Sequence, residues 1–259
     1  MIELKEWYIF LLLFLRASFI VFFLPVISSR YVPNAAKVAL SFFLAYMGFL
    51  YVAVTGLTEH IVLPTTIVEL IVVVLRELVF GFTVASICRL VFNAVELAGE
   101  YISYLMGLSI VNVVDPYYER MVPIVSHFQT IVAMLIFLVI GGHEWFFYAY
   151  RISIDVVPIT GSKLVEPSVI GDIIPLLGTI YTMAVIVGAP LLIVMMIVQF
   201  SLALISRMLP QLNVFMVGFP LQLIVGFWTL FISTSAFNYV VSKIFVMYRD
   251  IIFQVIRLF

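Results

Sequence analysis

Long stretches of this chain are apolar at nearly every position, and polar residues gather in short breaks between them. Proline, glycine, serine and asparagine, which favour turns, mark those breaks. Apolar residues occupy every face of the long stretches instead of alternating with polar ones, so the strands of a membrane β-barrel are excluded and α-helices are predicted. Six apolar helical segments are expected, over residues 7–27, 38–54, 61–106, 122–140, 173–206 and 214–246.

Three of these segments, 61–106, 173–206 and 214–246, do not fit single membrane spans. A helix of about 45 residues extends roughly 68 Å, whereas the hydrocarbon core of a bilayer is about 30 Å thick. A proline inside a helix removes a hydrogen bond and bends the helix, so Pro190 predicts two half-length pieces in segment 173–206. We assign both Pro190 and Pro210 to kinks.

The third segment carries charges, and a charge facing lipid costs about 2.5 to 3.5 kcal/mol at the bilayer centre. Glu69 and Arg76 are two helical turns apart, as are Arg89 and Glu96, which is too far for contact within one helix. One interpretation is that the charges have partners on other helices, including helices of other chains. The other is that two short helices join near Arg76 and Glu77 and leave the charges at a membrane interface. The charged residues are Glu69, Arg76, Glu77, Arg89, Glu96 and Glu100.

The composition supports a membrane protein. Hydrophobic residues make up 65% of the 259 residues and charged residues 10%, against roughly 45–50% and about 25% in soluble domains. The chain is therefore predicted to be an all-α integral membrane protein, with residues 1–259 forming a single domain. A net charge of −1 with scattered basic residues argues against nucleic acid as a partner.

Motifs that carry chemistry are missing from the sequence. His60, His127 and His143 are far apart and lack the spacing of a helical zinc pair. No phosphate-binding loop and no nucleophile elbow occurs. We therefore expect no catalytic, cofactor-binding or metal-binding residues, and no enzymatic activity.

One polar segment, SRMLPQLNVFMVGFP at residues 206–220, interrupts a long and otherwise almost uncharged part of the chain. It is interpreted as a kinked turn between two helices. Discontinuous helices also build substrate paths in transporters, and in that case Arg207 and Asn213 would line the path.

The same segment resembles the signature of the FliR family, the flagellar counterpart of the SctT subunit of type III secretion export gates. Further resemblances follow in family order along the chain: Arg16 and Pro25, RELVFGF at 76–82, ELAGEYISYLMG at 96–107, a Gly-Gly-His segment at 141–143, and GAP at 188–190. The continuation at 217–227 resembles flagellar members, although Gln222 stands where a lysine is expected. The matching residues of the signature are Arg207, Pro210, Gln211, Asn213, Gly218 and Pro220.

The resemblance implies a flagellar biosynthetic protein that is a core subunit of the type III export gate, the conduit for unfolded flagellar proteins across the inner membrane. It implies a FliP-like part fused to a FliQ-like helical hairpin, and assembly with FliP and FliQ, with FlhB on the cytoplasmic side. The location would be the bacterial inner (plasma) membrane, at the flagellar basal body. Most helices would then face protein, so the charges of residues 69–100 are expected to have partners on neighbouring subunits.

The resemblance also implies a plug loop between the third and fourth segments. By its residues alone this is an exposed loop, but its valines could exclude water from a pore constriction. Asn112 and the pair Asp115-Pro116 supply the turn that prevents a continuous helix. The plug residues are Gly107, Leu108, Ser109, Ile110, Val111, Asn112, Val113, Val114, Asp115, Pro116, Tyr117 and Tyr118.

The sequence alone is also compatible with other functions. A subunit of a virulence-type export gate shares the same family features. A secondary transporter with discontinuous helices would account for the prolines, and a membrane-embedded enzyme would need a catalytic constellation that is not found. A gate subunit should copurify with two other small membrane proteins, whereas a transporter should purify alone and bind a solute.

Overall fold

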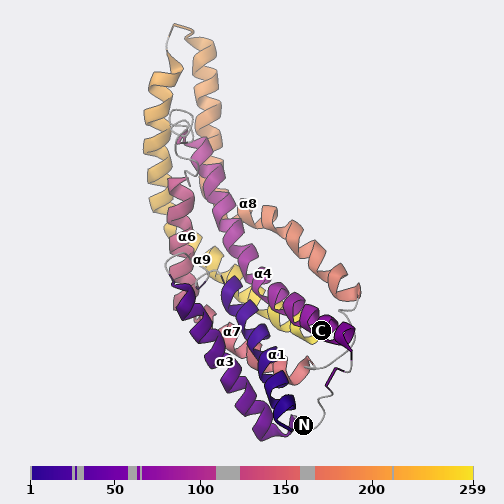
Figure 1. Ribbon diagram of the computed structural model, residues 1–259. Helices are drawn as coiled ribbons and strands as arrows, with labels where there is room; N and C mark the ends of the chain where they lie inside the picture. Colours follow the sequence, from indigo (N-terminus) through magenta and orange to yellow (C-terminus); the bar gives the residue numbers. More distant parts are fainter. Residues whose placement is uncertain are drawn as a thin grey trace. The chain divides into compact units, whose positions relative to one another are not determined.

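The computed structural model describes residues 2–24, 27, 32–57, 63–64, 66–108, 123–157, 167–211 and 213–258. Within these ranges the chain forms helices and no strands, which confirms the predicted all-α class. The helices are α1 (Ile2–Phe23), α3 (Asn34–Thr55), α4 (Ile67–Leu105), α6 (Ile124–Val139), α7 (Gly142–Val156), α8 (Pro167–Met208) and α9 (Val214–Leu258) (Figure 1).

Five of these helices, α1, α3, α4, α8 and α9, are long and apolar enough to cross a membrane. The shorter α6 and α7 count as a sixth candidate if they form one broken span. The predicted number of about six apolar segments agrees with this range. The chain is a membrane protein.

The chain folds into two compact units. The first consists of residues Met1–Leu90, Gly141–Leu177 and Val246–Phe259, and the second of Val91–Ile140 and Gly178–Phe245. Each unit therefore combines segments that are far apart in the sequence.

The first unit is built around α1. Its buried residues Ile9, Leu12, Leu13, Ala17 and Ile20 follow the three- and four-residue spacing of one helical face. This face lies in a group formed by α1, α3 and α7, with α1 and α3 side by side (Figure 1).

The sequence pattern does not predict helix α7, because this helix is short and amphipathic. It buries Phe146, Ala149 and Tyr150, and its polar side forms a contact with α3. Arg151 stacks on the ring of Tyr51 at 4.8 Å and donates a hydrogen bond to its hydroxyl at 3.1 Å, while Tyr51 donates to Asp155 at 2.8 Å. Hydropathy alone misses such a helix, because charged and polar residues interrupt its apolar sequence.

The second unit packs α4, α6, α8 and α9 through large apolar side chains. The rings of Phe92, Phe137 and Phe245 lie 5.1 to 5.7 Å apart in tilted or edge-on geometry. A Cβ atom on Gly99 of α4 would collide with the backbone of Ser126 on α6, so glycine permits the close approach of these two helices. The Ser126 hydroxyl donates to the Glu96 carbonyl oxygen at 2.9 Å across this contact.

The two expected proline kinks turn out differently. Helix α8 is unbroken at Pro190, so the prediction of two half-length pieces is wrong. Removing one backbone hydrogen bond does not end a helix whose neighbouring turns are held by packing, here Gly188 against Ala98 of α4. Pro210 lies beyond the end of α8, in the turn before α9.

The last helix is longer than its sequence pattern suggests. Segment 214–246 is predicted to end before the polar residues at 249–250, but α9 continues to Leu258. Tyr248, Ile252, Val255 and Ile256 are buried, and their spacing of four, three and one residues keeps one apolar helical face through this extension.

Candidate functional site

A buried ion pair joins the helices of the first unit. Arg16 of α1 and Glu77 of α4 are each 1% exposed, and the guanidinium group donates to both carboxylate oxygens, with Nη2 to Oε1 at 2.7 Å. This two-pronged geometry suits arginine and carboxylate, and it offsets the cost of removing both charges from water. Glu77 therefore has a partner on another helix of the same chain.

Arg16 also binds α7. Its Nη1 donates to the carbonyl oxygen of Ser153 at 2.7 Å and to the Ser153 hydroxyl at 3.2 Å, and the guanidinium group lies 5.1 Å from the centre of the Phe80 ring. The same side chain thus connects α1, α4 and α7. The lone arginine in an apolar helix is the available sequence signal, but its partners on α4 and α7 cannot be read from spacing.

The remaining charges of α4 lie along one continuous helix of 39 residues. The alternative of two short helices joined near Arg76 and Glu77 is therefore wrong. Arg76 is 5% exposed, and its Nη2 lies 3.6 Å from Glu77 Oε1. The others are exposed in this chain; they are Glu69, Arg89, Glu96 and Glu100.

The carboxyl end of α4, where the expected plug loop begins, has a defined cap. Gly107 adopts φ 75°, a left-handed conformation that favours glycine. The N–H of Gly107 donates to the Tyr104 carbonyl and the N–H of Leu108 to that of Ser103, both at 3.0 Å. Together these bonds form a Schellman motif, with Leu108 packed on the apolar cluster that includes Met106.

Two helices hold this cap in place within the second unit. Gln199 of α8 donates from Nε2 to the Leu105 carbonyl oxygen at 3.0 Å, which satisfies a free carbonyl at the end of α4. On the other side, Gly107 faces Gln222 and Phe219 of α9. Of the plug residues, Gly107 and Leu108 are placed by the structure, and residues 109–118 lie outside the described part.

The 206–220 signature contains the end of α8, the turn between α8 and α9 and the start of α9, which confirms the interpretation as an interhelical turn. The Asn213 side-chain oxygen accepts a hydrogen bond from the Met216 N–H at 3.4 Å and so caps the start of α9. Gly218 is buried against Leu202, and Pro220 lies inside α9. The other signature residues are exposed around the turn; they are Arg207, Pro210, Gln211 and Asn213.

No group of three or more histidine, cysteine, aspartate or glutamate side chains is placed to hold a metal ion within the described ranges. The single cysteine, Cys88, is buried inside α4. The polar features described above are thus an ion-pair cluster, a helix cap and a helical turn.

Residues 7–247 match the family described as bacterial export proteins, family 1. The flagellar biosynthetic protein FliR of Aquifex aeolicus is 31% identical to the chain, with 93% of this chain and 91% of that protein covered. The chain belongs to the FliR family. The resemblance of its motifs is confirmed.

Other members of the FliR family show a comparable extent of similarity. The FliR protein of Bacillus subtilis is 29% identical, with 91% of this chain and 90% of that protein covered. That of Escherichia coli is 27% identical over 78% of this chain and 75% of its own length. The family match over residues 7–247 therefore includes the ion pair, the helix cap and the helical turn.

Proposed function

We propose that the chain is a core subunit of the flagellar type III export gate, which forms the conduit for unfolded flagellar proteins across the bacterial inner membrane. The match of residues 7–247 to a family of export proteins carries this proposal. The relatives named as flagellar biosynthetic proteins favour the flagellar system over a virulence-type system. The chain acts by shape and packing, without covalent chemistry, and is not an enzyme.

The partners proposed are FliP and FliQ within the gate and FlhB at its cytoplasmic side, in the inner membrane at the flagellar basal body. The parts of α8 and α9 that lie in the second unit, residues 178–208 and 214–245, form the FliQ-like hairpin, since they run antiparallel on either side of the Pro210 turn (Figure 1). Large apolar side chains on this hairpin are exposed in the isolated chain, among them Ile193, Phe200 and Phe231. An apolar surface of this kind requires lipid or other apolar protein as its neighbour.

Neighbouring subunits supply partners for the exposed charges of α4. Arg89, Glu96 and Glu100 lie in a helix that is otherwise largely apolar. Such charges in membrane helices normally face protein or water and pair with opposite charges. The proposal rests on these three residues, because Arg76 is buried beside Glu77 and Glu77 is paired with Arg16 within the chain. Glu69, which the sequence also suggested for this role, does not carry it.

Residues 107–118 form the plug that closes the conduit at rest. The support from the structure is the position of the loop's first residues, because the Schellman cap and Gln199 hold the end of α4 between the two helices of the hairpin.

Coexpression tests the proposed function. The chain, tagged at its carboxyl end, is expressed with the FliP and FliQ proteins of the same genome, and the membranes are extracted with a mild detergent. A gate subunit elutes with both partners as one particle of constant composition. A chain that elutes alone and binds a small solute would be a transporter, and the proposal would then fail.

A further inference from the structure

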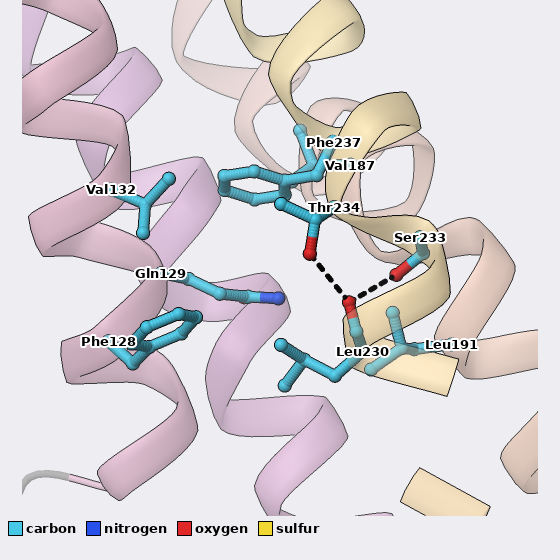
Figure 2. Close-up of a pocket in the computed structure, with 9 residues that line it drawn as sticks. All are labelled: Phe128, Gln129, Val132, Val187, Leu191, Leu230, Ser233, Thr234 and Phe237. Carbon is cyan, nitrogen blue, oxygen red and sulfur yellow. Dashed lines mark hydrogen bonds between the residues drawn. The ribbon is translucent and has the colours of Figure 1, made fainter. Parts of the chain in front are cut away.

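An open groove on the first unit lies between α7 and the carboxyl end of α9, and its volume is about 770 Å³. Binding sites for small molecules commonly have volumes of about 300–1,000 Å³. In contrast, the cavity between α6, α8 and α9 of the second unit is only about 20 Å³, which is too small for such a molecule (Figure 2). Of these two spaces, only the groove can hold a ligand larger than water.

Aromatic rings form one part of the groove's lining. Tyr148 of α7 and Phe253 of α9 meet edge to face, with 5.6 Å between the ring centres, and so join the two helices. Tyr148 is nevertheless 55% exposed. Tyrosine and tryptophan are enriched where membrane helices meet the headgroups of lipids, because their rings are apolar and their polar atoms reach water. The rings therefore offer an apolar surface beside a polar one.

Charged side chains form the other part of the lining. Arg249 lies over the Trp145 ring, 5.7 Å from its centre, and donates from Nε to Asp250 at 3.0 Å. Both members of this pair stay accessible, at 38% and 61% exposure. Arg151 and Glu144 of α7 also line the groove and are exposed. Two cationic and two anionic groups, whose formal charges cancel, thus adjoin the aromatic rings.

The groove lies at the end of a candidate membrane span. Helix α3 has 22 residues, which at 1.5 Å each extend about 33 Å, close to the thickness of about 30 Å of the hydrocarbon core. Its ends are therefore expected at the level of the lipid headgroups. Tyr51 lies one turn before the end of α3, and its hydroxyl accepts a hydrogen bond from Arg151 of the groove at 3.1 Å. The charged lining is thus tied to this end of the span.

We propose that the groove binds a zwitterionic phospholipid of the phosphatidylethanolamine type. The guanidinium groups of Arg151 and Arg249 donate to its phosphate, and its ammonium group donates to the carboxylates of Glu144 and Asp250. The acyl chains extend from the headgroup along the exposed aromatic rings. Because this assignment needs only a chain that lies in a membrane, it does not depend on the proposed export function.

The balance of charge selects this class of lipid. An anionic headgroup, such as that of phosphatidylglycerol, would place its negative charge near two carboxylates and offer no cation to them. A choline headgroup has a positive charge but no N–H group, so it cannot donate hydrogen bonds to the carboxylates. An ethanolamine headgroup meets both the cationic and the anionic side chains.

Retention of lipid by the purified protein tests the site. The full-length chain is coexpressed with the proposed partners, stripped of lipid in detergent and mixed with phosphatidylethanolamine, phosphatidylglycerol or phosphatidylcholine of identical acyl chains. Native mass spectrometry then counts the lipids that stay bound. Phosphatidylethanolamine should be retained several-fold more than either of the other two. Coelution of the partners is scored separately, so that the export function and the lipid site can each fail alone.

Three variants connect the retained lipid to the groove. Arg249→Gln removes a phosphate donor and should lower the retention of phosphatidylethanolamine several-fold. Glu144→Gln removes a carboxylate and should reduce the preference for phosphatidylethanolamine over phosphatidylcholine. The matched control is Arg257→Gln, because Arg257 is an exposed arginine of the same helix that is not among the lining residues, and retention should stay unchanged. The elution volume reports whether each variant is folded.

Photocrosslinking in membranes distinguishes a lipid from a protein in the groove. Phe147 lines the groove and is 39% exposed, so a photoreactive benzoylphenylalanine in its place should form an adduct with phospholipid. An adduct with another protein instead would overturn the proposal and make the groove a protein interface. Equal retention of the three lipids by the unmodified protein would also overturn it, as would a folded Arg249→Gln variant that retains as much phosphatidylethanolamine as Arg257→Gln.

Discussion

At the scale of residues, the buried ion pair of Arg16 and Glu77 is the main polar contact described in the first unit. A buried pair gains little over an apolar pair of equal size, because the attraction only repays the loss of hydration. The pair has a larger effect on which arrangement of the helices is adopted, since any arrangement that leaves one buried charge unpaired is far more costly. The guanidinium group reaches two further helices, so the pair selects one register of α1 against α4 and α7.

Removing one partner should therefore be worse than removing both. Glu77→Leu alone leaves Arg16 buried without its carboxylate and should lower the free energy of unfolding by about 3–5 kcal/mol. The double variant Arg16→Met with Glu77→Leu should cost clearly less. Thermal melting in detergent, together with recovery of the complex on native gels, measures both effects.

The matched control is Arg89→Ala, which removes an exposed charge from the same helix and should change stability by no more than about 0.5 kcal/mol in the isolated chain. A double variant as unstable as Glu77→Leu would contradict this account. In the complex, a loss of recovery on Arg89→Ala would instead support the proposed intersubunit role of that charge.

The helix cap at Gly107 yields a second prediction for a single residue. An alanine there must adopt φ 75°, and its Cβ would approach Gln222 and Phe219 at 3.2 Å. The strain of about 1 kcal/mol or more should loosen the end of α4 and the loop that follows. Gly107→Ala should therefore raise ion leakage in cells that contain the other gate subunits.

The control is Gly56→Ala. Gly56 has φ 73° and no atom within 4 Å of the position a Cβ would take. The backbone strain should therefore be similar to that of Gly107→Ala, but it falls at the end of α3, away from the proposed plug. If both variants leak equally, the leakage does not depend on the helix cap. The proposed role of the cap as the attachment point of the plug would then be refuted.

At the scale of helices, close packing depends on where glycine lies. Gly99 allows α4 to approach α6 so closely that the Ser126 hydroxyl reaches a backbone carbonyl of α4. Gly178 of α8 has no neighbouring atom within 4 Å of the position a Cβ would take. The two glycines lie in helices of the same unit, yet they meet opposite surroundings.

These surroundings predict opposite effects of the same substitution. Gly99→Ala should destabilise the chain by about 1–3 kcal/mol, because a Cβ forces the two backbones apart. Gly178→Ala should be neutral or stabilise by up to about 1 kcal/mol, because alanine is the better helix former. Melting temperatures of the two variants in the same detergent check this. A Gly99→Ala variant as stable as Gly178→Ala would show that α4 and α6 can separate without cost.

For the whole molecule, the proposed plug is the feature with the clearest physiological consequence. Deleting residues 108–118 should leave the gate open to ions and small solutes, because the valines that exclude water are gone. Cells carrying the deletion with the other gate subunits should show raised membrane conductance and slower growth in high salt. Unchanged permeability, with the mutant complex present in normal amount, would reduce this segment to a structural loop.

Hydropathy and local motifs were enough to assign the class of this protein. Stretches that are apolar at every position, without alternating polar residues, can cross a membrane only as helices. The helical fold therefore follows from the sequence pattern. The motifs at 76–82, 96–107 and 206–220 led to the FliR family. The turn at Pro210 is also predictable, because proline cannot continue a helix that packing does not support.

In contrast, which polar side chains contact each other depends on how the helices pack in three dimensions. Arg16 and Glu77 are 61 residues apart, and Gln199 and Leu105 are 94 apart, so no spacing rule connects them. The continuity of α8 through Pro190 and the presence of α7 have the same origin. Local preference predicts a break or a loop at these places, but burial of side chains against other helices supplies more free energy than the local signal removes.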